Sequence, residues 1–215
     1  MGLGVSNSLS KGGFPQYRTR TSCSMEGGDG EYITTGGHAD FQLNGVDFSI
    51  SGWIKFTADA TSTTNEDGKV ILEMEDDDGN GVYIAYLDES GDDEWFRVYH
   101  KWNDGSNSIT CSASGNDIDH GEWYNFTYTY DVSALTGRIY VDGTQAGIRT
   151  SMTSPGDFTT AHDILIGNGP SSNDNALIKV CEIGYWKGVC LSASQVTSIY
   201  NNGRPRNLLG VEREY

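Results

Sequence analysis

The sequence predicts an all-β fold: a two-layer antiparallel β-sandwich with one short C-terminal helix. In FSISGWIKF (48–56) apolar side chains recur at every second position, which is the period of a strand with one buried face. The composition agrees, because 28 Gly, 12 Tyr, 7 Phe and 5 Trp in 215 residues suit short aromatic strands joined by tight turns. A chain of this length can bury about 70% of its unfolded surface without help from metals or disulfides.

The expected strands are separated by clusters of Gly, Asn, Asp and Ser. They span residues 23–26, 31–34, 48–56, 69–75, 81–87, 95–101, 108–112, 122–131, 137–142, 163–167 and 178–187. Turns such as DGNG (78–81) and DG (142–143) supply the residues that hairpins need at positive φ, so the chain is mainly an antiparallel meander. So many strands must fold into two layers to limit their exposed edges.

Both layers need an apolar row that faces the space between them. The alternation places the following residues in this core: Phe48, Ile50, Ile54, Ile71, Ile84, Phe96, Val98, Phe126, Tyr128, Ile139, Val141, Leu165 and Ile183. Trp53 and Lys55 are expected to point away from it. One helix is predicted within residues 191–203, with Ser192 as its N-cap and Gly203 at its end, as a lid or edge plug.

Charge and targeting signals restrict the possible partners. The net charge of −16 argues against nucleic acid, and no window is long and apolar enough to span a membrane. The N-terminal residues lack a secretory signal, so we expect synthesis in a host cytoplasm. The four cysteines lack C-x-x-C spacing and are expected to be buried, reduced thiols, whereas the four histidines are expected on the surface or in turns.

Residues 1–21 are predicted to form an extended, basic arm. They contain Lys11, Arg18 and Arg20 but no acid, and they are rich in glycine. Two explanations remain open: a disordered terminus, or a docking strap that orders on an acidic neighbouring subunit. The sandwich would span residues 22–209, and residues 210–215 would be a C-terminal tail.

Five segments in order resemble the laminin G-like and concanavalin A-like lectin/glucanase superfamily. They are FSISGWIKF (48–56), GEWYNFTYTYD (121–131), GRIYVDG (137–143), ILIGNG (164–169) and IKVCEIGYWKGVCLSASQVTSIYNNGRP (178–205). The resemblance implies a concanavalin A-like jelly roll. In that family the last strand carries two adjacent acidic residues, whereas this chain has Cys181 and Glu182 there, so only Glu182 matches the pattern. The opening MGLGVSNSLSKGG also resembles the N-termini of small virion proteins of tailed bacteriophages, which implies a structural protein, either a capsid decoration or a tail-associated protein.

Glucanases on this fold carry catalytic acids in an E-x-D-x-x-E strand. The nearest segment here is EMEDDD (73–78), in which Glu73 and Glu75 share a face but the acids run into a turn, so we expect no enzyme activity. Asp76, Asp78 and Asn80 match the first half of a calcium loop, although position twelve is Leu87 instead of glutamate. The sequence thus predicts half a Ca²⁺ site, and a solvated acidic hairpin is the alternative.

A mixture of aromatic and polar residues suggests a glycan site. Aromatic faces stack on pyranose rings while Asp and Asn fix hydroxyl groups; the candidates are Trp95, Tyr99, Trp102, Asn103 and Asp104, with Tyr83 and Tyr86 across a neighbouring strand. The alternative is that these aromatics belong to the core or to a subunit interface.

The sequence therefore favours a non-enzymatic structural and adhesion module of a larger assembly, in a phage virion. Its arm would contact other subunits, and its loops would bind a cell-surface glycan or a protein. We expect a homo-oligomer, because several weak contacts made together give a higher overall affinity. The alternative is a free carbohydrate-binding lectin or a glycoside hydrolase of the glucanase type.

Overall fold

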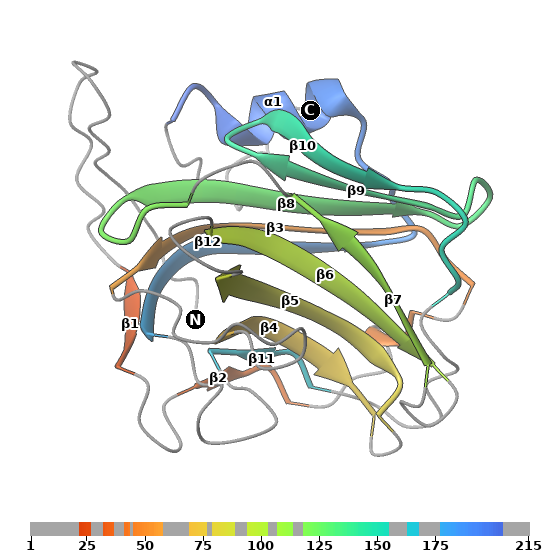
Figure 1. Ribbon diagram of the computed structural model, residues 1–215, viewed down its shortest axis with the longest axis horizontal. Helices are drawn as coiled ribbons and strands as arrows, with labels where there is room; N and C mark the ends of the chain where they lie inside the picture. Colours follow the sequence, from red (N-terminus) through yellow and green to blue (C-terminus); the bar gives the residue numbers. More distant parts are fainter. Residues whose placement is uncertain are drawn as a thin grey trace, which may run out of the picture.

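The computed structural model describes residues 22–26, 32–36, 41–43, 45–57, 69–76, 79–88, 94–102, 107–113, 118–154, 163–167 and 177–203. Within these ranges two six-stranded antiparallel sheets pack against each other, and a single helix lies outside the sandwich (Figure 1). The predicted all-β sandwich with one short C-terminal helix is confirmed.

The first sheet combines both ends of the described chain with its middle. Its strands, in spatial order, are β1 (Cys23–Glu26), β12 (Leu177–Lys187), β3 (Phe48–Phe56), β8 (Trp123–Asp131), β9 (Thr136–Val141) and β10 (Thr144–Arg149). The aromatic strand predicted at 48–56 therefore lies at the centre of this sheet, between β12 and β8.

The second sheet contains the longest meander of the chain. Its order is β2 (Ile33–Thr34), β11 (Leu165–Ile166), β4 (Lys69–Glu75), β5 (Gly81–Asp88), β6 (Glu94–Trp102) and β7 (Asn107–Ser112). Strands β4 to β7 follow one another as hairpins, as expected from the turn residues between them.

Strand β10 was not predicted, because TQAGIR shows no apolar alternation. It is an edge strand whose pairing with β9 shifts register between Gln145 and Gly147. A Cβ on Gly147 would overlap the carbonyl oxygen of Ser112 in β7, so glycine lets the edges of the two sheets approach each other here.

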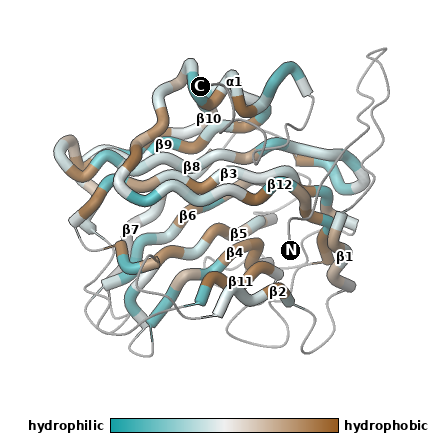
Figure 2. The backbone as a smooth tube through the Cα atoms, turned by 180° about the vertical axis from the view of Figure 1, so that it is seen from behind, coloured by the Kyte–Doolittle hydropathy of each residue, from teal (hydrophilic) through white to brown (hydrophobic). Residues whose placement is uncertain are grey.

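The core lies between the sheets and is largely aromatic. Phe56 of the first sheet stacks on Tyr86 of the second with ring centroids 3.7 Å apart, and Phe96 lies beside Phe56 at 6.0 Å. Figure 2 shows hydrophobic residues along the strands of both sheets. Two core predictions need correction: Leu165 is half-buried while Ile166 fills the core, and Ile183 is half-buried against the core.

The surface prediction for histidines is wrong for His100. Its ring is fully buried, with Nδ1 3.0 Å from the Thr153 carbonyl oxygen and Nε2 2.8 Å from the Tyr128 hydroxyl. Burial disfavours the charged imidazolium and lowers the pKa of His100 to about 4. His120, in contrast, lies exposed in a turn as expected.

The four cysteines are free thiols, as predicted, but they are not all buried. Cys111 and Cys181 are buried, and burial raises the pKa of each thiol to about 12. Cys190 is half-buried, and Cys23 is exposed because it lies on the edge strand β1.

Helix α1 (Ala193–Tyr200) covers the outer face of the first sheet. Ser192 and Gln195 form a capping box at its N-terminus, whereas the helix ends at Asn201, which has a φ of 51°, and not at Gly203. Trp53 points away from the core as expected, but it is only 2% exposed and stacks on Tyr200 at 5.7 Å. Strand β3 is therefore buried on both faces, and the prediction that it has a single buried face is wrong. No helix among these residues is long and apolar enough to cross a membrane.

Candidate binding face

The outer face of the second sheet, opposite the core, carries a second set of aromatic and ionisable residues. Strand register places one residue from each of its six strands in a single row across the sheet: Thr34, Leu165, Glu73, Tyr83, Tyr99 and Thr110. Because neighbours in this row are directly opposite on adjacent strands, their side chains lie close together on one face. We call this surface the outer face of the second sheet.

Apolar residues support the row from one side. Val70, Tyr83, Ala85, Leu87 and Tyr99 form a cluster of their own, separate from the main core, and Trp95 packs against it. Tyr83 is 5% exposed and Tyr99 7% exposed, so the face is a packed platform with a polar margin.

Two cations lie over the aromatic rings of the platform. Arg97 has its Cζ 5.9 Å from the centre of the Trp95 ring and 6.0 Å from that of Tyr99. The Nζ of Lys101 lies 4.1 Å from the centre of the Tyr83 ring. Such contacts stabilise exposed cations by about 0.5–1 kcal/mol each and hold the rings in place.

Glu75 is tied into this arrangement by two partners. The Tyr83 hydroxyl donates a hydrogen bond to it, and Lys101 Nζ lies 3.5 Å from its Oε1. Gly81 is the residue between Glu75 and Lys101 in the register, and a Cβ on it would overlap the backbone carbonyl oxygen of Met74 in β4. Burial raises the pKa of Glu75, although Tyr83 and Lys101 oppose this by favouring the carboxylate.

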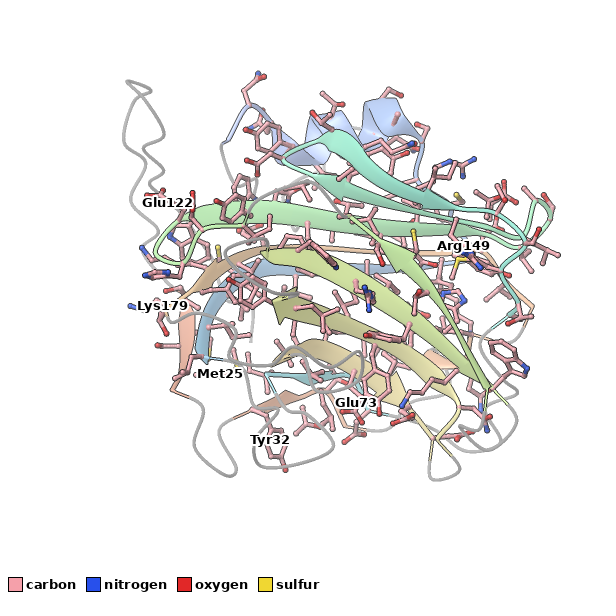
Figure 3. The ribbon with its side chains drawn as sticks, viewed as in Figure 1. Met25, Tyr32, Glu73, Glu122, Arg149 and Lys179 are labelled. Atoms are coloured by element: carbon pink, nitrogen blue, oxygen red, sulfur yellow. The ribbon has the colours of Figure 1, made fainter. Side chains whose placement is uncertain are left out.

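Glu73 occupies the middle of the row without such partners. Its Oε2 is buried and has no hydrogen-bond partner among the described residues; Figure 3 labels it on the second sheet. Burial raises the pKa of Glu73 to about 7, repulsion by Glu75 adds to this, and Lys101 opposes it. At neutral pH this carboxyl is therefore close to half protonated.

A second unpaired polar atom belongs to the same face. The indole Nε1 of Trp95 is buried and lacks a hydrogen-bond partner within the described ranges. A buried donor or acceptor that stays unpaired costs about 1–3 kcal/mol, so native structures keep few of them. The face thus holds one donor, at Trp95, and one carboxyl oxygen, at Glu73, that no described residue satisfies.

The structure divides the residues predicted to bind glycan. Trp95 and Tyr99 lie on the outer face together with Tyr83. Trp102 is the last residue of β6, half-buried, and by strand alternation has the opposite orientation. Tyr86 lies in the core instead, and its hydroxyl donates to the Ile118 carbonyl oxygen at 3.1 Å. Asn103 and Asp104 lie outside the described residues.

Two of the predicted calcium ligands, Asp76 and Asn80, are described by the structure, and they hydrogen-bond to each other across the β4–β5 turn. The Asp76 carboxylate accepts hydrogen bonds from the backbone N of Asn80 at 2.8 Å and from its Nδ2 at 3.0 and 3.1 Å. Asp78 lies outside the described residues, as do Lys11, Arg18 and Arg20 of the predicted arm. Within the described ranges no group of three or more His, Cys, Asp or Glu side chains is placed to hold a metal ion. The calcium site stays a prediction.

Sequence reasoning found the shared face of Glu73 and Glu75 but missed the roles of Arg97 and Lys101. The signal was present in EWFRVYHKW, where Trp95, Arg97, Tyr99 and Lys101 alternate with core residues. Arg97 and Lys101 cover aromatic rings of this face.

The comparison with protein families decides the classification. Residues 26–206 match the family described as the concanavalin A-like lectin/glucanases superfamily. The chain belongs to this superfamily. A search of curated proteins found no matching sequence.

Solved structures with a similar fold include a pentraxin and the binding domains of two toxins. A heptameric SAP-like pentraxin from Limulus polyphemus has a TM-score of 0.61 and 12% identity, over 91% of this chain and 81% of the pentraxin chain. The binding domain of Paraclostridial Mosquitocidal Protein 1 has a TM-score of 0.63 and 17% identity, over 93% of this chain and 46% of the other. The binding domain of botulinum neurotoxin serotype G has a TM-score of 0.60 and 16% identity, with the same coverage. This superfamily member thus spans less than half of either toxin chain.

Proposed function

We propose that this protein is a non-enzymatic carbohydrate-binding module and that the outer face of the second sheet is its binding surface. The observation that carries the proposal is the pair of unpaired polar atoms on an aromatic platform, Trp95 Nε1 and Glu73 Oε2. Sugar hydroxyl groups both donate and accept hydrogen bonds, while their ring faces pack on aromatic side chains, so one ligand class fits both features.

The positions of the two atoms favour an oligosaccharide over a single sugar. Trp95 is opposite Leu87 on β5, four residues from Tyr83, and Tyr83 is opposite Glu73 on β4. With about 3.3 Å per residue along a strand and about 4.8 Å between strands, Trp95 and Glu73 lie about 16 Å apart. One ligand must therefore extend diagonally over β4, β5 and β6 to reach both.

Structural neighbours support binding as the general role. The similar toxin chains are binding domains, and botulinum neurotoxin type C, with a TM-score of 0.53 and 17% identity over 73% of this chain and 35% of its own, depends upon interaction with two ganglioside molecules for cell entry. The Glu73 and Glu75 pair lacks the full acid pattern of the glucanases, and Glu75 is held by Tyr83 and Lys101. These features favour a lectin over a hydrolase.

Replacing Trp95 with alanine is expected to weaken oligosaccharide binding at least tenfold, because it removes both the ring and the indole donor. Trp95→Phe keeps a ring but not the donor and should lose less. Binding is measured on a glycan array and then by titration calorimetry with the best oligosaccharide. Trp123→Ala, a half-buried tryptophan in the first sheet, is the matched control and should bind normally. Loss of binding in Trp102→Ala but not in Trp95→Ala would instead place the site at the loop after β6.

We further propose that the module is mounted on a larger assembly, a phage virion, through residues 1–21. The basic residues Lys11, Arg18 and Arg20 in a chain of net charge −16, and the virion-like opening sequence, support this proposal. A heptameric pentraxin with the same fold is consistent with a homo-oligomer. Deleting residues 1–21 is expected to abolish incorporation into particles while glycan binding persists; particles that still incorporate the shortened chain would contradict the proposal. An Ala substitution at Ile148, exposed on β10, controls for nonspecific loss.

A further inference from the structure

We propose that Glu73 is the specificity-determining residue of the outer face: it selects neutral over acidic oligosaccharides and makes their binding weaken as the pH rises above neutrality. This inference rests on the proposed carbohydrate-binding function and adds the ligand class and its regulation. It starts from the position of Glu73 between Leu165 of β11 and Tyr83 of β5, with one buried oxygen that no described residue satisfies.

The groups around Glu73 compensate its charge only in part, because Lys101 favours the charged form while burial and Glu75 disfavour it. On its own strand, Glu75 repels it, and on β5 the Tyr83 hydroxyl donates to Glu75 instead. On β6, Lys101 lies 3.5 Å from Glu75 and over the Tyr83 ring.

On the other side of Glu73, the described residues of β11 and β2 contribute no cation. On β11 the neighbour is the apolar Leu165, and beyond it Asp163 accepts a hydrogen bond of 2.7 Å from Thr34. Arg97 lies farther along β6, near the rings of Trp95 and Tyr99.

This arrangement explains why ligand binding and proton binding are coupled. An oligosaccharide lying over Glu73 removes water that still reaches the carboxyl, and desolvation disfavours the charged form further. The protonated carboxyl is neutral and can donate a hydrogen bond to a sugar oxygen, which its ionised form cannot do. The binding-competent protein is thus the one in which Glu73 carries its proton.

The same charges explain the selection of neutral sugars. A sialic acid or uronic acid would place a further carboxylate beside Glu73 and Glu75, while Lys101, which favours the Glu73 carboxylate, is already paired with Glu75. The net charge of −16 adds long-range repulsion of acidic ligands. Neutral hexose chains avoid both penalties.

The size of the pH effect follows from the protonated fraction. Since burial and Glu75 raise the pKa of Glu73 to about 7, that fraction falls about tenfold between pH 6 and pH 8. The apparent affinity for a neutral oligosaccharide should fall by the same factor, because only the protonated protein binds it well. Binding that changes less than twofold over this range contradicts the inference.

The experiment uses the full chain and compares three neutral sugars, cellohexaose, maltohexaose and fully N-acetylated chitohexaose, with a sialylated hexasaccharide, by titration calorimetry at pH 6 and pH 8. We expect wild-type protein to bind a neutral hexasaccharide about tenfold more tightly at pH 6 and to bind the sialylated one at least tenfold more weakly than the neutral one. Glu73→Gln, which mimics the protonated acid in size, should bind the neutral sugar equally at both pH values. Glu122→Gln, at an exposed glutamate near the first sheet, is the matched control and should keep the wild-type pH dependence.

Independent readouts separate the failure of this inference from failure of the proposed function. Carbon-13 NMR of the glutamate carboxyls should show one group titrating near pH 7 that is missing in Glu73→Gln; a Glu73 midpoint near its ordinary value of 4.5 overturns the inference. Oligosaccharide binding that is independent of pH, or equal for acidic and neutral sugars, overturns the inference alone. Absence of binding to every sugar at both pH values overturns the proposed function together with it.

Discussion

Replacing Phe56 with alanine is expected to lower the free energy of unfolding by about 3–5 kcal/mol. Phe56 is 1% exposed on β3 of the first sheet, and its ring stacks at 3.7 Å on Tyr86 of the second sheet. The substitution leaves a cavity where the two sheets meet, and it removes an aromatic contact that joins them. Urea denaturation followed by tryptophan fluorescence measures the loss.

Ile148→Ala provides the control for this experiment. Ile148 is 53% exposed on the edge strand β10, so its truncation should change the unfolding free energy by less than about 0.5 kcal/mol. A loss below 1 kcal/mol in Phe56→Ala would mean that the sheets do not meet at this residue as described.

The second large effect concerns His100 and pH. The free-energy difference between wild type and His100→Gln is expected to shrink by about 3 kcal/mol between pH 7 and pH 4. In the folded protein burial lowers the pKa of His100 to about 4, against 6.5 in an exposed histidine. The contribution of neutral His100 to stability is therefore complete above pH 6.5, and it is lost as the pH falls towards 4.

The titration of Glu73 changes the free energy of unfolding in the opposite direction, so the pH profile of wild type alone does not isolate the effect of His100. The pKa of Glu73 is raised, so Glu73 favours the folded state below pH 4.5 and this contribution is lost as the pH rises through about 7. The two trends partly cancel in the wild-type protein. Urea denaturation at half-unit pH steps separates them, and His120→Gln, at an exposed histidine, should follow wild type. A free-energy difference between wild type and His100→Gln that stays constant with pH would show that His100 has the same pKa in the folded and unfolded states.

The proposed binding face and the core are the two sides of the same strands. On β6, Phe96 and Val98 fill the core while Trp95, Arg97 and Tyr99 lie on the outer face. The hairpins from β4 to β6 bring Glu73, Tyr83 and Tyr99 into register, so the core that stabilises the sandwich also positions the candidate ligand contacts. Core variants that shift this register are therefore expected to alter binding as well as stability.

Alternation and turn chemistry in the sequence were enough to locate most strands, because side-chain direction on a strand has a period of two and hairpin turns need particular residues. They also identified the helix through its N-cap at Ser192. They did not identify β10, since an edge strand buries little and needs no apolar alternation. They also placed Leu165 in the core one position away from Ile166, because a two-residue strand is too short to define its own phase.

The sequence by itself determined that this protein is built of strands with two unlike faces, because that pattern is local. Only the tertiary structure decided what covers each face: α1 over Trp53, the opposite sheet around His100, and the Tyr83, Glu75 and Lys101 group that leaves Glu73 unpaired. Burial and charge pairing depend on residues that are distant in the chain. Strand alternation predicts which side chains share a face. The solvation and the pKa of those side chains depend on the partners that folding brings to that face.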